Sequence, residues 1–165
     1  MFFRGGSMNR SQNAGLARKV IHRGSSWSTG LLTSRKMNRC VPWESPVERD
    51  FIHLLEYNRD VKAYFAQPFK IDFHFDGRGC TYFPDFRVEF VGGGEVIYEV
   101  KPEAELKEPD VRKRMDAIEL YFERRGMSFE IETDLKIRRG LRLKNIKTLF
   151  PYLYDNPGSR EILAL

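Results

Sequence analysis

Two strand-like segments joined by glycines constrain this chain more than any other feature of its sequence. The first ends in YFPDFRVEF, the second is EVIYEVK, and Gly92 to Gly94 stand between them. Alternation of apolar and polar residues is typical of β-strands, and a short glycine-rich connection is typical of a hairpin. The sequence therefore predicts an antiparallel pair running from Tyr82 to Phe90 and from Glu95 to Lys101.

The predicted hairpin gathers charged side chains on one face. We take Val91 to pair with Glu95 across the turn. Asp85 then lies opposite Lys101, and Glu99 sits diagonally beside it. A slip of the turn by two residues would change these pairs but would keep the three charged side chains on one surface. The other face carries the residues expected in the core, Val96, Tyr98 and Val100.

A helix is expected before these strands. Ser45 suits the N-cap, Pro46 suits the first helical position, and Glu48 completes a capping box. Asn58 and Asp60 mark the helix exit. Apolar residues recur between these ends at helical spacing and should face the core: Val47, Phe51, Leu54 and Leu55.

The remaining pattern completes the fold prediction. Alternation over residues 69–75 predicts a strand that forms an antiparallel meander with the hairpin. A long helix over 109–125, a strand over 127–133 and a short helix over 145–153 should follow. The order α-β-β-β-α-β-α predicts an α+β fold, in which helices flank a mixed sheet.

Charge divides the chain into an arm and a domain. Residues 1–43 hold eight Lys or Arg and no Asp or Glu, whereas residues 44–165 hold 20 basic and 23 acidic side chains. We expect a basic, flexible arm over 1–40, a folded domain over 41–155 and a tail over 156–165. A basic arm suits a nucleic-acid phosphate backbone, and it suits a solvated tail equally well.

Composition excludes several classes of protein. Cys40 and Cys80 belong to no CxxC or Cys/His pattern and make no disulfide framework. No apolar run approaches the length of a membrane span, and the opening MFFRGG does not resemble a secretory signal. We therefore expect a soluble protein of the cytoplasm, encoded by a bacterium or a phage, with no membrane partner.

The charged face suggests metal-assisted chemistry on a phosphodiester. Asp85 and Glu99 offer oxygen ligands to a hard divalent cation such as Mg²⁺, and the Val100 carbonyl can add another. Lys101 is placed to orient the attacking water or to offset charge that develops on the phosphate. A lone Pro-Asp or Glu-x-Lys occurs by chance in many strands, so the prediction depends on their joint arrangement.

These motifs, in this order, resemble the PD-(D/E)xK nucleases, which have a restriction-endonuclease-like core. More narrowly, the chain resembles TnsA, the endonuclease subunit of heteromeric cut-and-paste transposases. The resemblance covers roughly residues 34–153. It rests on SRKMNRCVPWESPVERDFIHLLEYNRDVKAYFAQPFKIDF, YFPDFRVEF, YEVKP, FEIETDLKIR and LKNIKTLFPYL.

The resemblance implies a set of site residues. Asp85 corresponds to the central metal ligand, Glu99 to a position that is acidic or an amide, and Lys101 to the catalytic lysine. A glutamate of the first helix joins the metal site in the family. Glu48 is the favoured candidate, and Glu44, one turn earlier, is its rival. The implied cofactor is Mg²⁺, for which Mn²⁺ can substitute.

Candidate DNA contacts lie outside this set. Gln67, in FAQPF, matches a family position and would support the site or position DNA. Arg35 and Lys36, in the first matching stretch, and Arg112, on the second long helix, are candidates to meet the phosphate backbone. A solvated face is the alternative for the basic residues of that helix.

The resemblance also implies a function in transposition, a form of DNA recombination. It implies Mg²⁺-dependent cleavage of one DNA strand at each transposon end, beside a TnsB-like DDE transposase and a TnsC-like ATPase regulator. Two other functions stay open. One is a phage head-completion or other stand-alone DNA nuclease, and the other is a catalytically silent DNA-binding or assembly module on a nuclease fold.

Overall fold

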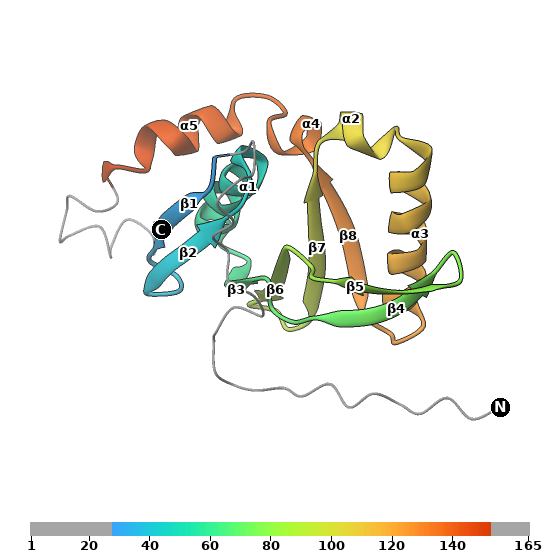
Figure 1. The fold of residues 1–165 in the computed structure, drawn as a ribbon. Coiled ribbons are helices and arrows are strands. Elements are labelled where there is room, and N and C mark those ends of the chain that lie inside the picture. The colour runs from blue at the N-terminus through green and yellow to red at the C-terminus, as the bar shows by residue number, and fades with distance from the viewer. Residues whose placement is uncertain (1–27, 153–165) are drawn as a thin grey trace.

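A four-stranded mixed sheet forms the centre of residues 28–152, the part of the chain that the computed structural model describes (Figure 1). β6 and β7 pair antiparallel, as do β3 and β6, whereas β7 and β8 are parallel. This is the mixed sheet that the sequence predicts. In spatial order its strands are β3 (Val61–Ala66), β6 (Phe86–Phe90), β7 (Glu95–Lys101) and β8 (Ser128–Thr133).

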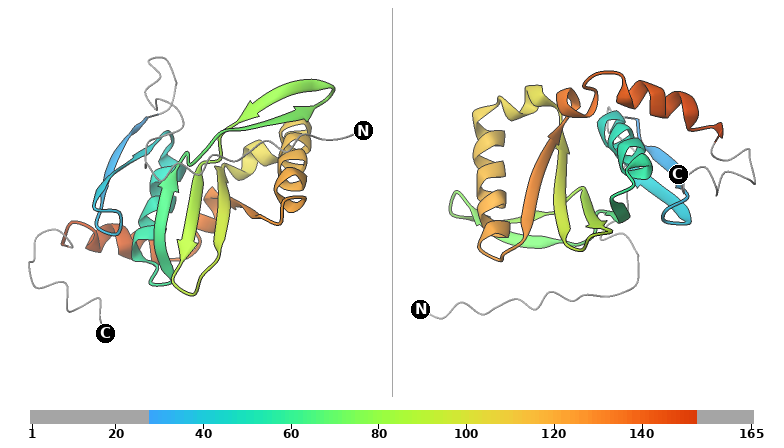
Figure 2. Two further views of the ribbon diagram at one scale, coloured as in Figure 1. Left: turned by 90° about the horizontal axis from the view of Figure 1, so that it is seen from below. Right: turned by 180° about the vertical axis from the view of Figure 1, so that it is seen from behind.

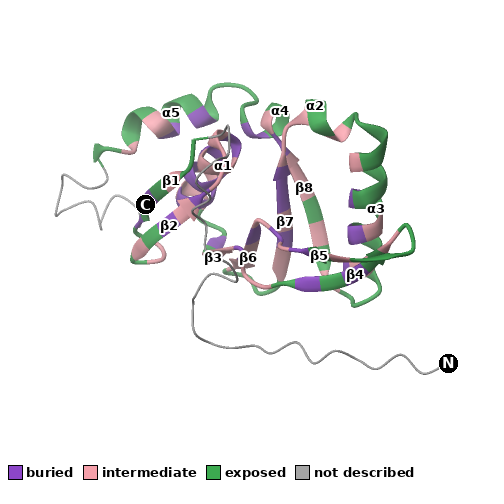
Figure 3. Cartoon of the chain, in the orientation of Figure 1, coloured by how far each residue is buried: buried purple, intermediate pink, exposed green. Residues whose placement is uncertain are grey.

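Two long helices cover opposite faces of this sheet (Figures 1 and 2). Helix α1 (Pro46–Tyr57) packs on one face, where Val88 and Val100 join its core cluster. Helix α3 (Pro109–Glu123) packs on the other, where Ile97 is fully buried. Because both faces of β7 are covered, its side chains alternate between two cores and not between core and solvent (Figure 3).

Two hairpins flank the central sheet. The first joins β1 (Gly30–Ser34) to β2 (Arg39–Trp43) beside α1, and its Val41 is buried in the α1 core. The second joins β4 (Ile71–Phe75) to β5 (Arg78–Tyr82) and packs on the α3 side (Figure 2).

Three short helices complete the described fold. They are α2 (Glu103–Leu106), α4 (Asp134–Ile137) and α5 (Arg142–Leu149). Figure 1 shows α2 following β7 and α4 following β8 at the same end of the sheet. No helix between residues 28 and 152 is long and apolar enough to cross a membrane.

Helix α1 begins and ends as predicted. The Ser45 hydroxyl accepts a hydrogen bond from the Glu48 N–H, and Pro46 is the first helical residue. The Glu48 carboxylate accepts from the N–H of Glu44, one residue before the N-cap, at 2.8 Å, whereas the predicted capping box would have it accept from the N–H of Ser45. Asn58 is the C-cap. These local signals predict the helix well because they lie within one turn of its ends.

The predicted antiparallel meander is wrong in its strand pairing. The strand predicted over 69–75 exists as β4, but it pairs with β5 and does not enter the central sheet. The strand predicted over 82–90 is interrupted at Phe83–Asp85, because Pro84 has no N–H with which to continue a ladder. The unpredicted β3 pairs with β6 instead.

The β6–β7 hairpin was predicted, but its register is shifted by two residues. Phe86 lies opposite Tyr98, where the predicted pairing would put it opposite Val100. Continuing this register by one residue puts Asp85 across from Glu99, not from Lys101. Because the shift is an even number of residues, the predicted faces are kept.

The predicted boundary at residue 41 also differs from the structure. Hairpin β1–β2 belongs to the folded domain, which therefore includes residues 30–40 of the predicted arm. Residues 1–27 of that arm and the predicted tail over 156–165 lie outside the described residues. Their predicted character is untested.

A buried glutamate joins hairpin β1–β2 to the rest of the fold. Glu56, on α1, is 7% exposed, and one carboxylate oxygen accepts from the hydroxyls of Ser34 and Tyr64, both at 2.7 Å. The other oxygen accepts from the N–H groups of Arg35 and Lys36, at 2.7 and 3.1 Å. One side chain thus satisfies donors from β1, the hairpin turn and β3.

We expect Glu56→Ala to lower the free energy of unfolding by about 3 kcal/mol or more, because it leaves buried donors without an acceptor. Urea denaturation followed by circular dichroism measures this loss. Glu123→Ala, at the exposed end of α3, is the control and should change stability little. A Glu56→Ala protein as stable as the control would contradict the role assigned to this carboxylate.

Candidate active site

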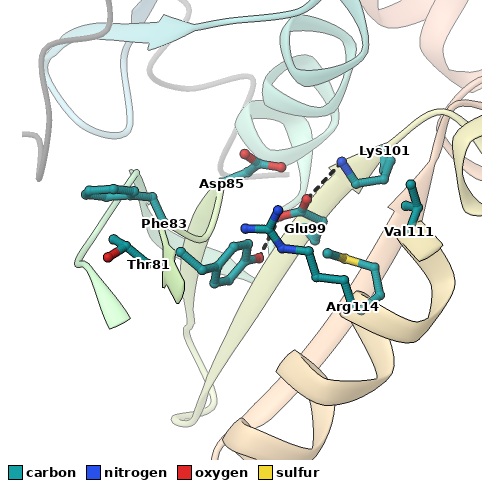
Figure 4. Close-up of a pocket in the computed structure, with 9 residues that line it drawn as sticks. Thr81, Phe83, Asp85, Glu99, Lys101, Val111 and Arg114 are labelled. Carbon is teal, nitrogen blue, oxygen red and sulfur yellow. Dashed lines mark hydrogen bonds and ion pairs between the residues drawn. The ribbon is translucent and has the colours of Figure 1, made fainter. Parts of the chain in front are cut away.

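A cavity of about 290 Å³ opens between the end of β5, strand β7 and helix α3 (Figure 4). Three of the four predicted catalytic residues lie in its wall: Asp85, Glu99 and Lys101. Residues of the hairpin β4–β5 form one side of the cavity, and residues of α3 form the other. The remaining lining residues are Thr81, Tyr82, Phe83, Val111, Arg114 and Met115.

Asp85 is fixed by main-chain hydrogen bonds on two sides. Its carboxylate accepts from the N–H of Val100, on β7, at 2.7 Å. Its carbonyl accepts from the N–H of Gln67, just after β3, at 2.8 Å. Gln67 is buried and has a φ of 44°. The backbone of Gln67 therefore supports Asp85, while a direct role for its side chain stays a prediction.

Glu99 is 5% exposed and is engaged through both carboxylate oxygens. The Tyr82 hydroxyl donates to one oxygen at 2.6 Å, and the Lys101 ammonium lies 3.2 Å from the other (Figure 4). The same ammonium lies 3.7 Å from Glu105. Burial alone would lower the Lys101 pKa, but Glu99, with Asp85 and Glu105, raises it above its ordinary value. Lys101 is therefore a cation at neutral pH.

The carboxylates of the site are held close to one another at an electrostatic cost. Burial raises the pKa of Asp85 well above its ordinary value, and the charges of Glu99 and Glu48 add to this effect. Burial, with the nearby charges of Glu44 and Glu99, raises the pKa of Glu48 to about 7. Glu48 thus approaches the site from α1.

This donor set fits a hard divalent cation in its chemistry. Glu48, Asp85 and Glu99 supply oxygen ligands, and a bound cation would offset their mutual repulsion. Among residues 28–152, no three carboxylate, imidazole or thiolate groups already converge closely enough to hold a metal ion. Binding of one cation by all three carboxylates would therefore need side-chain rearrangement, starting from a Glu99 whose oxygens contact Tyr82 and Lys101.

The interactions of Glu48 and Glu44 differ in a way that bears on which of them is the helix carboxylate of the site. Glu48 raises the pKa of Asp85 directly. Glu44 instead donates its N–H to the Glu48 carboxylate, and its charge acts on Glu48. Glu48 therefore remains the favoured candidate for the helix carboxylate, and its role stays a prediction.

The predicted DNA contacts lie outside the cavity. Lys36 donates its ammonium to the carbonyls of Asn58 and Val61, and burial lowers its pKa. Arg35 gives its N–H to Glu56 in the same turn. We no longer propose Lys36 as a DNA contact, because its ammonium already donates to two carbonyls inside the fold.

The basic residues of α3 divide between two faces of the helix. Arg112 is exposed and forms an ion pair with Asp116 at 2.9 Å, and it does not line the cavity, so we no longer propose it as a DNA contact. Arg114, which the sequence analysis did not select, lines the cavity. The sequence did contain a signal for this. Arg114 is three residues after Val111, so the two share a helix face, and it precedes Met115, which is buried. Tyr82 was also missed.

Residues 58–134 match the family model described as TnsA-like endonuclease N terminal. The match supports a TnsA-type nuclease domain over these residues. The matched region runs from the end of α1 to the start of α4, so it includes Asp85, Glu99 and Lys101 and leaves Glu48 outside. A search of curated proteins found no match.

The TnsA-like match confirms two of the predictions. The predicted resemblance to TnsA is confirmed, and the α+β sandwich agrees with the predicted restriction-endonuclease-like fold. The family description also identifies the domain as a nuclease. The roles of the individual site residues stay predictions.

We expect Asp85→Asn to stabilise the metal-free protein at pH 8 by about 1–2 kcal/mol, since it removes a carboxyl group whose charged form is unfavourable in the fold. The folded protein holds protons at Asp85 and Glu48 that the unfolded chain releases, with the Glu48 pKa raised from 4.5 to about 7. Stability is therefore lost as the pH rises through this range. The gain should be small at pH 4.

Thermal unfolding in the presence of a chelator measures this gain. Asp76→Asn is a matched control, because Asp76 is exposed in the β4–β5 turn and its φ of 49° suits asparagine equally well. If Asp85→Asn melts at or below the wild-type temperature at pH 8, the carboxylates do not repel one another as we describe.

Proposed function

We propose that this chain is a metal-dependent DNA endonuclease that hydrolyses phosphodiester bonds at the cavity of Asp85, Glu99 and Lys101. One observation carries the proposal. These three residues line one cavity, and all three lie inside the region that matches the TnsA-like family model. Glu48 completes the site from α1.

The proposed cofactor is Mg²⁺, for which Mn²⁺ would substitute. Asp85, Glu99 and Glu48 would hold it through carboxylate oxygens, with the Val100 carbonyl as a further ligand. When bound, such a cation polarises a phosphodiester and lowers the pKa of water. Burial is the main cause of the raised pKa values of Asp85 and Glu48, and the charges of neighbouring carboxylates add to it. A bound cation would offset that repulsion, which supports the assignment.

The chain's own groups supply position and charge. The Val100 N–H holds the Asp85 carboxylate, and the Tyr82 hydroxyl holds that of Glu99. Lys101 enters the reaction as a cation, because its pKa is raised. It therefore donates hydrogen bonds to the attacking water or to a phosphate oxygen and offsets developing charge, and it does not act as the base.

The proposed biological role is strand cleavage at transposon ends. The family description supports DNA as the substrate and a Tn7-like transposition context. In that setting the chain would act beside a TnsB-like DDE transposase, which cuts the other strand, and a TnsC-like ATPase, which regulates cleavage. We propose both as partners.

Plasmid cleavage tests the proposal. In Mg²⁺ or Mn²⁺ the wild-type protein should nick or linearise supercoiled DNA, alone or with the two partner proteins. Asp85→Ala and Lys101→Ala should lower the rate by about 100-fold or more, because each removes a group that stabilises the transition state. Lys107→Ala, at an exposed lysine just after α2, is the control and should cleave normally.

Two results would count against the proposal. Cleavage that persists in both variants would place the active site elsewhere or trace the activity to a contaminant. Absence of cleavage by the wild-type protein with both metals and both partners would contradict a nuclease function and favour a DNA-binding or assembly role.

A further inference from the structure

Arg114 is a charged residue of the cavity that the chemistry described above does not use. It projects from α3, and Figure 4 shows its side chain extending toward Glu99. Its charge reaches the Tyr82 hydroxyl: burial and the nearby Glu99 raise the Tyr82 pKa, and Arg114 opposes them. The guanidinium therefore lies close to the groups that hold Glu99.

The donors of Arg114 are not used inside the fold. The other ionisable groups at the centre of the cavity are engaged, because Glu99 contacts Tyr82 and Lys101, and Asp85 accepts from Val100. Within residues 28–152, Arg114 forms neither a hydrogen bond nor an ion pair. A fully charged, exposed guanidinium thus stands beside the candidate catalytic groups with its hydrogen-bond donors available.

The backbone that carries Arg114 is firmly anchored. Met115, Ile118 and Phe122, on the inner face of α3, are buried in the core cluster under the sheet. The Arg114 Cα therefore has a fixed place relative to β7, while its side chain reaches into the cavity. This combination is suited to binding a ligand group at a set distance from the carboxylates.

A guanidinium in this position matches a phosphate in shape and charge. Its planar fork of donors binds two phosphate oxygens at once, and it stays charged at every physiological pH. A carboxylate could bind the same fork, but the DNA substrate proposed above supplies phosphates. A nucleic-acid strand placed over these residues would bring further phosphates of its backbone to the α3 wall.

We infer that Arg114 binds a backbone phosphate of the DNA strand and so places the strand over Asp85 and Glu99. The inference rests on the proposed nuclease function for its substrate. Arg114 is a positioning residue in this account: it contacts the DNA beside the bond to be cleaved, while Lys101 serves the reacting phosphate.

The chain offers a matched control for this inference. Arg112 is on the same helix, two residues away, is exposed and carries the same charge. Its guanidinium faces Asp116 and not the cavity. A nonspecific effect of removing positive charge from α3 should appear in Arg112→Ala as well as in Arg114→Ala, whereas a specific phosphate contact should appear only in the latter.

Fluorescence anisotropy with a labelled DNA duplex, across a range of salt concentrations and without metal, tests the contact. Arg114→Ala should weaken binding about three- to tenfold and reduce the slope of log K against log[salt] by about one, as expected for one lost phosphate contact. Arg114→Lys should restore the slope but only part of the affinity, because lysine lacks the bidentate fork. Arg112→Ala should match wild type.

Cleavage by the same variants separates this inference from the proposed function. Arg114→Ala should need about three- to tenfold more DNA for half-maximal cleavage and keep a near-normal kcat, as expected when ground-state and transition-state binding fall together. Asp85→Asn should lose cleavage and keep the wild-type salt slope.

An unchanged affinity and salt slope in Arg114→Ala would overturn the inference and leave the nuclease proposal intact. An equal loss in Arg112→Ala would overturn it too. If neither the wild-type protein nor any variant cleaves DNA, and only Arg114→Ala shows a smaller slope of log K against log[salt], the phosphate contact stands and the nuclease function fails.

Discussion

The hydrogen bond from the Val100 N–H to the Asp85 carboxylate is the constraint on which the site depends. Pro84 interrupts the strand before Asp85, so no ladder hydrogen bond of β6 places this residue. Asp85 is held instead by two N–H donors: that of Val100, which donates to its carboxylate, and that of Gln67, which donates to its carbonyl. Before the interruption, the hairpin β4–β5 leaves the central sheet and packs on the α3 side. There the Tyr82 hydroxyl donates to Glu99. The break in the strand, the cavity and the contact between Tyr82 and Glu99 thus lie side by side.

The site lowers the stability of the fold that carries it. Buried carboxylates next to one another are unfavourable in the absence of a cation, as the raised pKa values of Asp85 and Glu48 indicate. The buried Glu56 shows the contrast, because hydroxyl and N–H donors of Ser34, Arg35, Lys36 and Tyr64 point at its two oxygens. A cluster of carboxylates with raised pKa values is the arrangement expected where a ligand completes the site.

The parts of the account that the sequence predicted are those set by local rules. The caps of α1, the common face of Glu99 and Lys101 and the glycine hairpin follow from spacing within a few residues. Strand pairing over longer separations did not follow: β3 was missed, and β4 pairs with β5 because the chain turns at Asp76-Gly77 before it reaches the central sheet. The direction of Arg114 depends on how α3 packs over β7, which no local pattern of charges reports.

The central claim is that Asp85, Glu99 and Glu48 together form a metal site. Calorimetric titration of the full chain with MnCl₂ tests it most directly, because it needs neither DNA nor a partner protein. The account predicts one Mn²⁺ site in the wild-type protein, no binding by Asp85→Asn, weakened binding by Glu48→Gln and unchanged binding by Asp76→Asn. A wild-type protein that binds no Mn²⁺, or an Asp85→Asn variant that binds it as well as wild type, would contradict the claim.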